Sequence, residues 1–263
     1  MPYSHNRQGV FVFKEEKTDF PSLYHQHHLE YQEDFKFWLS LARQGGSPLL
    51  ELGCGTGRLL LPLAEAGLKC FGIDNDQCML DFLQNQIPDE VRDRIQTFYA
   101  DFISFSLDIQ FPLIILPCNT YSTLQGKFRV SLLGCVYKQL TTNGIFVVSI
   151  PNPDLLLSQE ITQVSEIETI FPHPDTGNPV QVSYSIEKSV EAITFHWYYD
   201  QLLPDGKVQR STVCTVHTLI SSSDYLDEIR DSGFEIIETF GGFDRSVYSK
   251  DSPNLIIVAQ KFL

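Results

Sequence analysis

The stretch from Leu49 to Gly67, LLELGCGTGRLLLPLAEAG, decides the fold. Its first four residues predict a short buried strand, and the run from Arg58 to Ala66 predicts a helix. Between them, glycines stand at alternate positions, at Gly53, Gly55 and Gly57. Glycine permits positive φ and lets a ligand approach the main chain, and amides at a helix start attract negative charge. The stretch therefore predicts a loop that binds a ligand with an anionic end.

Two acids flanking this loop narrow the choice of ligand. Glu51 lies just before the glycines, and Asp74 ends the next predicted strand. A carboxylate in the second position accepts hydrogen bonds from ribose hydroxyls. The dinucleotide fingerprint GxGxxG fails, because Arg58 stands where its last glycine belongs, and a P-loop lacks its Gly-Lys-Ser/Thr. The pattern thus favours a nucleoside ligand other than a dinucleotide.

The rest of the first 153 residues alternates short apolar strands with helices. Such strands are typical of a parallel sheet covered on both faces. The sequence predicts strands at 69–73, 95–99, 113–116 and 145–150, and helices at 23–43, 76–87 and 127–140. We therefore expect an α/β fold with a doubly wound, Rossmann-like, seven-stranded and mostly parallel sheet, completed by a helix at 222–231 and strands at 234–240 and 255–261.

The pattern changes between the fifth strand and that last helix. Residues 164–219 are rich in Val, Ile, Tyr and Thr and alternate, and Pro204-Asp205-Gly206 forms a strong turn signal. We expect three or four antiparallel strands there. The predicted organisation is an N-terminal helical lid plus cofactor-binding core over 1–154, an antiparallel β insert serving as substrate lid over 155–220, and the rest of the core over 221–263.

The charge and cysteine content bear on partners and compartment. The net charge of -14 disfavours nucleic acid, because a phosphate-tracking protein needs a basic face. None of the six cysteines forms a CxxC pair, and His25 and His28 share a helix face without a third ligand, so we expect no metal site. Without a targeting pattern or a long apolar run, we expect a cytoplasmic protein that does not enter membranes.

The ordered motifs resemble those of class I S-adenosylmethionine-dependent methyltransferases. ELGCGTGR and GIDND are similar to the first two motifs of that family, and YADF to its third. FPLIILPCNTYSTL and LTTNGIFVVSIPNP resemble the fourth- and fifth-strand motifs, so the likeness covers about residues 35–153. In layout the chain is similar to the glycine N-methyltransferase-like and sugar-amine N-methyltransferase-like members, which carry an insert at a similar place.

The resemblance implies a role for each matching residue. Glu51 and the glycines would line the methionine end of S-adenosyl-L-methionine, Asp74 would hold the ribose, and Asp101 would meet the adenine. The alternatives are a helix-capping role for Asp74 and turn-forming roles for Asp101 and Asn119. The cofactor-binding residues implied are Tyr24, Glu51, Gly53, Cys54, Gly55, Gly57, Asp74, Asn75, Met79, Ala100, Asp101, Phe102, Pro117 and Cys118; the catalytic ones are Asn119 and Thr120.

The lid is expected to supply the contacts to the acceptor. On it, His196 and Tyr198 are the candidate substrate-binding residues, and they share one face of a predicted strand. The predicted function is methyl transfer to an amine or hydroxyl of a small molecule. A protein or peptide methyltransferase on the same fold, a non-catalytic cofactor-binding protein, a nucleotide-dependent oxidoreductase and a homodimeric assembly are left open.

Overall fold

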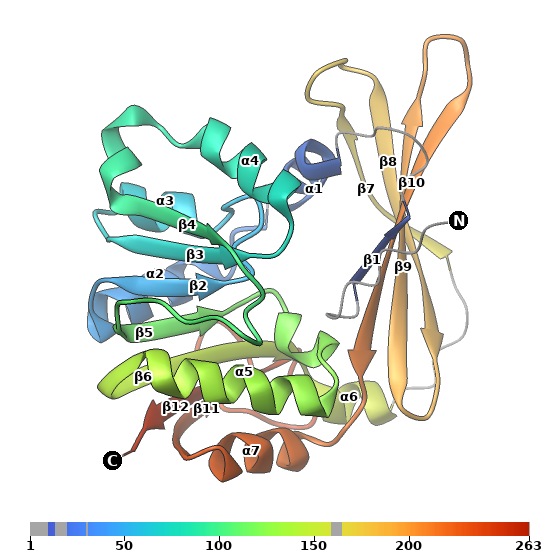
Figure 1. The fold of residues 1–263 in the computed structure, drawn as a ribbon. Coiled ribbons are helices and arrows are strands. Elements are labelled where there is room, and N and C mark those ends of the chain that lie inside the picture. The colour runs from blue at the N-terminus through green and yellow to red at the C-terminus, as the bar shows by residue number, and fades with distance from the viewer. Residues whose placement is uncertain (1–9, 14–19, 30, 159–164, 263) are drawn as a thin grey trace. The chain divides into compact units, whose positions relative to one another are not determined.

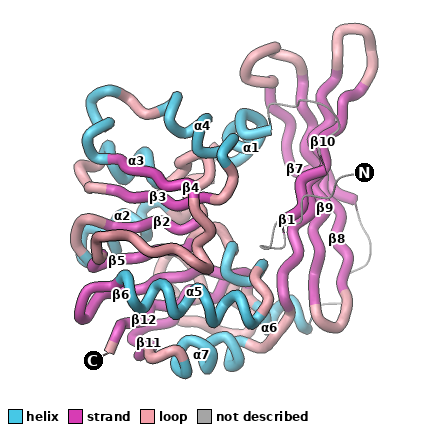
Figure 2. The backbone as a smooth tube through the Cα atoms, in the orientation of Figure 1, coloured by secondary structure: helices cyan, strands magenta, loops and turns pink. Residues whose placement is uncertain are grey.

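The computed structural model describes residues 10–13, 20–29, 31–158 and 165–262. They form two compact units. The core unit comprises residues 31–122, 126–158 and 220–262, and the lid unit comprises 10–13, 20–29, 123–125 and 165–219. Figure 2 shows that the core unit alternates helices and strands, whereas the lid unit consists mainly of strands. Residues 1–9, 14–19, 30 and 159–164 of the expected N-terminal lid and insert lie outside the described residues.

The core unit is built on a seven-stranded sheet of order β11-β12-β6-β5-β2-β3-β4. Strands β2 to β6 pair in parallel, and β12 runs antiparallel to both of its neighbours. This confirms the predicted doubly wound, mostly parallel sheet. The strands are β2 (Leu49–Leu52), β3 (Cys70–Asp74), β4 (Ile95–Tyr99), β5 (Phe111–Leu116), β6 (Leu140–Pro151), β11 (Phe234–Phe240) and β12 (Asn254–Lys261).

The strand order places a switch point at β2. From β2 the chain adds β3 and β4 on one side and then returns to add β5 on the other. Ligands of open α/β sheets bind outside the carboxyl ends of the strands at such a point. The loop after β2 begins at Gly53, and the loop after β5 begins at Pro117. Both loops therefore lie at the edge of the sheet where a ligand is expected.

Helices cover both faces of this sheet, with α5 in front of it in the view of Figure 1. Side chains of α2, α3 and α4 form one buried cluster with alternate strand residues such as Leu49, Leu113 and Val147. Because neighbouring strand residues point to opposite faces, Leu50 and Ile114 face the other side. The helices are α2 (Phe35–Gly45), α3 (Leu60–Glu65), α4 (Gln77–Gln86), α5 (Gly126–Gln139), α6 (Pro153–Ser158) and α7 (Ser222–Asp231), with 3-10 turns η1 (Asp89–Arg94) and η2 (Thr120–Thr123).

The expected single helix over 23–43 is wrong. The structure has two helices, α1 (Phe20–His28) in the lid unit and α2 in the core unit. The periodicity of the aromatic residues continues across the break, but Asp34 precedes α2, where its carboxylate accepts hydrogen bonds from Trp38 and Arg58 instead of capping the helix. The periodic pattern alone therefore does not reveal the break between the two helices.

The lid unit is a five-stranded antiparallel sheet of order β1-β10-β9-β8-β7. Residues 165–218 supply four strands, where three or four are predicted, and β1 adds a fifth from the N-terminal stretch, for which no element is predicted. The strands are β1 (Val10–Phe13), β7 (Ser165–Pro172), β8 (Pro179–Lys188), β9 (Ala192–Leu202) and β10 (Val208–Thr218).

Helix α1 packs on one face of this antiparallel sheet. Phe20 meets the ring of Tyr199 edge-on at 5.6 Å between centroids. His27 contacts the Tyr199 hydroxyl through Nδ1 at 2.8 Å and a carboxylate oxygen of Glu168 through Nε2 at 2.9 Å. These contacts group α1 with the antiparallel sheet in one compact unit.

A buried ion pair joins α5 to α7 inside the core unit. Arg129, 2% exposed, donates from Nε and Nη2 to the two carboxylate oxygens of Glu228, at 2.6 and 2.7 Å. The guanidinium also lies over the rings of Tyr121 and Tyr225. Such a bidentate pair fixes both helices in one relative position.

We predict that Glu228→Gln destabilises the protein by about 3 kcal/mol, because it leaves the buried Arg129 charge without its partner. The measurement is urea denaturation at pH 7. Arg230→Ala, which breaks the exposed pair with Asp227 on the same helix, is the control and should cost less than about 1 kcal/mol. Equal losses in the two variants would contradict this account.

Candidate functional site

The glycine loop after β2 has the backbone geometry that its sequence predicts. Gly53, Gly55 and Gly57 all have positive φ, at 70°, 51° and 83°. A Cβ at position 57 would collide with the side chain of Leu83, so that position requires glycine on steric as well as conformational grounds. The loop is anchored below by the amides of Gly53 and Cys54, which both donate to the Ile73 carbonyl.

Cys54 occupies the space that a glycine in the neighbouring strand leaves open. A Cβ at Gly72 of β3 would lie 2.7 Å from the Cys54 sulfur, closer than carbon and sulfur approach. Burial raises the pKa of the Cys54 thiol well above its usual value. Cys54 therefore packs as a small apolar side chain beneath the loop, and its role toward a ligand stays a prediction.

Asp74 at the end of β3 is tied directly to the glycine loop. Its carboxylate accepts from the Gly55 amide at 2.7 Å and from the Asp76 amide at 2.9 Å. Burial raises its pKa, and these amides oppose that rise. The cap of α4 is Asp76, which accepts from the amides of Cys78 and Met79. Capping therefore does not explain Asp74, whose carboxylate is held against the loop beside half-buried Asn75 and Met79.

Glu51 is the most perturbed acid of the site. It is 3% exposed, and its Oε2 has no hydrogen-bond partner among the described residues. Burial raises its pKa to about 8, an effect that the nearby Arg58 charge opposes and Asp34 and Asp74 reinforce. A buried carboxyl oxygen without a partner is costly, so the arrangement fits a ligand with a cationic or hydrogen-donating group at this point.

The end of β4 supplies the third acid. The Ala100 amide donates to the Asp74 carbonyl at 3.0 Å, which continues the link between neighbouring strand ends. Asp101 accepts from the Ile103 amide through Oδ1 at 3.1 Å, so the carboxylate does form a turn. Its role toward an adenine stays a prediction. Phe102 next to it is almost fully buried.

The end of β5 approaches the glycine loop from the other side. Atoms of Thr120 and Phe102 lie 3.8 to 3.9 Å from the position that a Cβ on Gly53 would take. Cys118 and Asn119, which follow Pro117, both adopt the left-handed conformation, with φ of 59° and 61°. This conformation costs a residue such as cysteine about 1–2 kcal/mol, while asparagine adopts it more readily, and such residues cluster at functional sites. The predicted residues Gly53, Phe102 and Thr120 are thus brought together.

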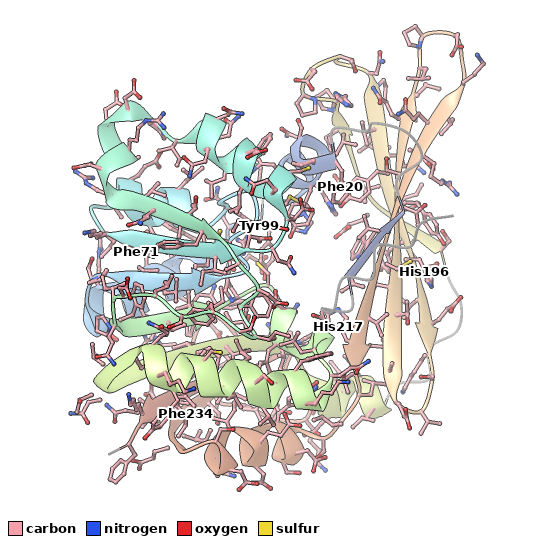
Figure 3. All side chains as sticks on the ribbon, in the orientation of Figure 1. Phe20, Phe71, Tyr99, His196, His217 and Phe234 are labelled. Carbon is pink, nitrogen blue, oxygen red and sulfur yellow. The ribbon has the colours of Figure 1, made fainter. Side chains whose placement is uncertain are left out.

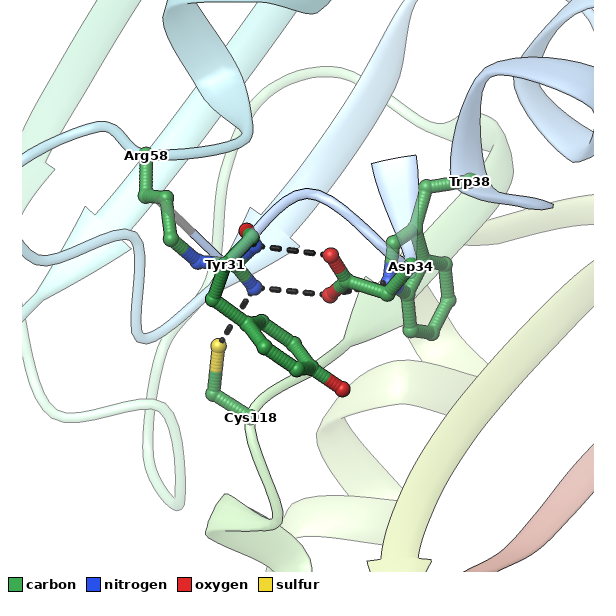
Figure 4. A network of polar contacts seen from close by, with 5 residues as sticks. All are labelled: Tyr31, Asp34, Trp38, Arg58 and Cys118. Atoms are coloured by element: carbon green, nitrogen blue, oxygen red, sulfur yellow. Dashed lines mark hydrogen bonds and ion pairs between the residues drawn. The ribbon is translucent and has the colours of Figure 1, made fainter. Parts of the chain in front are cut away.

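No local sequence pattern predicts the polar cluster around Arg58 (Figure 4). Its guanidinium donates to both oxygens of Asp34 at 2.8 and 2.7 Å, to the Tyr31 carbonyl at 3.0 Å and to the Cys118 sulfur at 3.1 Å. Burial lowers the Arg58 pKa, but the bond to Asp34 outweighs this and raises it overall. Asp34 lies inside the helix predicted over 23–43, so no local signal pairs it with Arg58.

The remaining predicted residues belong to the lid unit. Tyr24 of α1 stacks on His28 at 4.2 Å between ring centroids. On β9, His196 contacts the Cys214 sulfur at 3.0 Å, and the Tyr198 hydroxyl lies 3.2 Å from Ser185 Oγ. Their roles toward cofactor and substrate stay predictions.

The two substrate candidates lie on the face of β9 opposite to the one that α1 covers. Trp197 and Tyr199 meet the rings of α1, and alternation directs His196 and Tyr198 the other way. His217 of β10 packs edge-on against Phe195 on the α1 face, and burial lowers its pKa to about 4. Figure 3 labels both His196 and His217.

The described residues contain neither a group of side chains placed to hold a metal ion nor a helix that could span a membrane. In those residues, no group of three or more His, Cys, Asp or Glu side chains is placed to hold a metal ion. Every described helix is too short or too polar to cross a bilayer.

Comparisons with known proteins agree with this geometry. Residues 49–144 match the family described as methyltransferase domain. A Geobacillus sp. (strain WCH70) protein named as a methyltransferase is 24% identical over 228 residues, which cover 83% of this chain and 86% of that protein. A S-adenosylmethionine-dependent methyltransferase from Clostridium acetobutylicum has a TM-score of 0.76 at 14% identity, covering 94% and 100% of the two chains. The sugar N-methyltransferase KedS8 from Streptoalloteichus sp ATCC 53650 has a TM-score of 0.74 at 15% identity, covering 96% of each.

We predict that Glu51→Gln becomes more stable relative to the wild type as the pH rises from 5 to 7, by about 2 kcal/mol. A carboxyl whose folded pKa lies near 8 binds its proton more tightly in the folded state than in the unfolded state, where the pKa is near 4.5. Ionisation of Glu51 therefore destabilises the fold as the pH rises between those values. Glutamine does not ionise, so the variant lacks this pH-dependent loss of stability.

The measurement is urea denaturation at both pH values. Glu65→Gln, at an exposed carboxyl on α3, is the matched control and should differ from the wild type by the same amount at pH 5 and pH 7. A Glu51→Gln difference that does not change with pH would show that Glu51 is already ionised at pH 5.

Proposed function

We propose that this chain, a class I S-adenosylmethionine-dependent methyltransferase, transfers the methyl group to an amine nitrogen of a small molecule. The observation that supports this proposal is the row of carboxylates at the ends of the parallel strands. Glu51 lies in β2, Asp74 ends β3 and Asp101 is the second residue after β4, and these three strands are neighbours. This set suits a ligand with a cationic group, a ribose and an aromatic amine.

When bound, S-adenosylmethionine supplies a methyl group already activated by the positive sulfonium. Glu51 would pair its free buried oxygen with the ammonium group, and Asp74 would accept from the ribose hydroxyls. The glycine loop would let the ligand approach the main chain. The chain's task in such a transfer is mainly to align the reactants and exclude water.

The side chains after β5 support an amine as acceptor. Asn119 and Thr120 offer an amide and a hydroxyl, which orient a nucleophile through hydrogen bonds but are weak bases. An amine that arrives deprotonated needs no strong base, whereas a hydroxyl usually does. KedS8, whose fold this chain shares over almost its whole length, is described as a sugar N-methyltransferase. A small amine is therefore the acceptor class that we propose.

The cofactor role of Asp74 is tested by calorimetry with S-adenosylhomocysteine. We expect the wild type to bind and Asp74→Asn to bind about tenfold to a hundredfold more weakly, because a charge-assisted hydrogen bond is lost. Asp93→Asn, at an exposed acid of η1, is the control and should bind as the wild type does. Equal affinities for all three proteins would contradict the assignment.

The acceptor is tested by labelled-methyl transfer from S-adenosylmethionine. An amino sugar, the sugar with hydroxyl in place of the amine, and a peptide with a free N-terminus form the matched set. Label on the amino sugar supports the proposal. Label on the hydroxyl sugar alone, or on the peptide alone, would replace it by an O-methyltransferase or a peptide methyltransferase.

A further inference from the structure

We propose that Arg58 is a positioning residue, whose guanidinium fixes the left-handed turn at Cys118 and Asn119 to the 31–34 segment and so holds the end of β5 in its ligand-binding shape. The inference rests on the proposed function for its ligand, but its geometry is independent of any acceptor. No motif described above assigns this role.

The contacts of Arg58 reach segments that are far apart in the sequence. Its backbone directly follows the glycine loop, while its side chain bonds to Tyr31 and Asp34 before α2 and to Cys118 after β5. One side chain therefore connects three segments that are distant in sequence. Figure 4 shows the guanidinium between the Asp34 carboxylate and the Cys118 sulfur.

The ion pair between Arg58 and Asp34 is largely buried. The Arg58 side chain is 12% exposed and that of Asp34 is 2% exposed. The cost of removing two charges from water largely offsets their attraction, so such a pair contributes little net stability. Its geometric effect is larger, because Asp34 is also held by the Trp38 indole at 3.1 Å and cannot move freely. The carboxylate is thus a fixed point against which Arg58 is oriented.

The turn that Arg58 contacts has an unusual backbone conformation. Cys118 and Asn119 both have positive φ, and for a residue such as Cys118 this conformation persists only where surrounding contacts enforce it. Besides the Arg58 contact, Ser122 Oγ donates to the Asn119 carbonyl at 2.8 Å, and the Thr120 amide donates weakly to Pro117 at 3.4 Å. The Arg58 contact restrains this turn from the glycine-loop side.

The set of contacts at position 58 requires an arginine. The planar guanidinium bonds to both Asp34 oxygens and still has donors for a carbonyl and a sulfur. Lysine keeps the charge but has no planar fork, so it cannot make this set of contacts. The conservative change Arg58→Lys therefore keeps the positive charge and removes the hydrogen bonds that position the turn.

The experiment compares Arg58→Lys and Asp34→Asn with the wild type in two measurements. Hydrogen exchange read by mass spectrometry should be faster in residues 118–122 of both variants, without ligand. Calorimetry should give S-adenosylhomocysteine affinities about tenfold to a hundredfold weaker, as expected for a displaced binding group. Should Asp34→Asn not fold, Arg58→Lys and Cys118→Ala, which removes the sulfur contact alone, decide the question.

Arg92→Lys is the matched control. Arg92 also bonds an acid and a main-chain carbonyl, at Asp89 and Ile87, but in η1 before β4, at the amino edge of the sheet. It should leave both measurements unchanged. Wild-type exchange in 118–122 together with wild-type affinity in Arg58→Lys would overturn the inference. A wild type that binds no S-adenosylhomocysteine would instead refute the proposed function, while the exchange measurement still tests the position of the turn.

Discussion

The core unit depends on β2, a strand of four residues that is buried on both faces between β3 and β5. Because β2 is hydrogen-bonded to β3 on one side and to β5 on the other, its end is fixed relative to the ends of both neighbours. The glycine loop starts at that fixed point and reverses the chain into α3. Its hydrogen bonds to Ile73 and Asp74 then transmit the position of β2 to the end of β3.

This constraint also explains the electrostatics of the site. Parallel strands end at one edge, so acids at the ends of neighbouring strands are brought close together and partly removed from water. Glu51 lies within the buried strand, and its pKa rises most. Asp74 has amide donors that oppose the same effect. The positive charge of Arg58 opposes the rise in the Glu51 pKa, and the guanidinium is itself held in place by its ion pair with Asp34.

The lid unit shows a different way of building a fixed structure. Its strands alternate, so one face receives the aromatic residues that meet α1 and the other carries polar side chains such as His196 and Tyr198. A histidine with two partners, His27, joins α1 to this sheet. The helix therefore belongs to the lid unit although a periodic sequence runs from it into α2.

The sequence by itself determined the sheet, the glycine loop and the acids of the strand ends, because short apolar strands, alternate glycines and capping acids act through near neighbours. It identified Asp76 only as part of a helix start, and could not separate its capping role from that of Asp74. Only the tertiary structure decided the break between α1 and α2, the addition of β1 to the lid sheet and the Arg58–Asp34 pair. Each of these depends on a partner distant in the chain, and no local pattern of residues records such a partner.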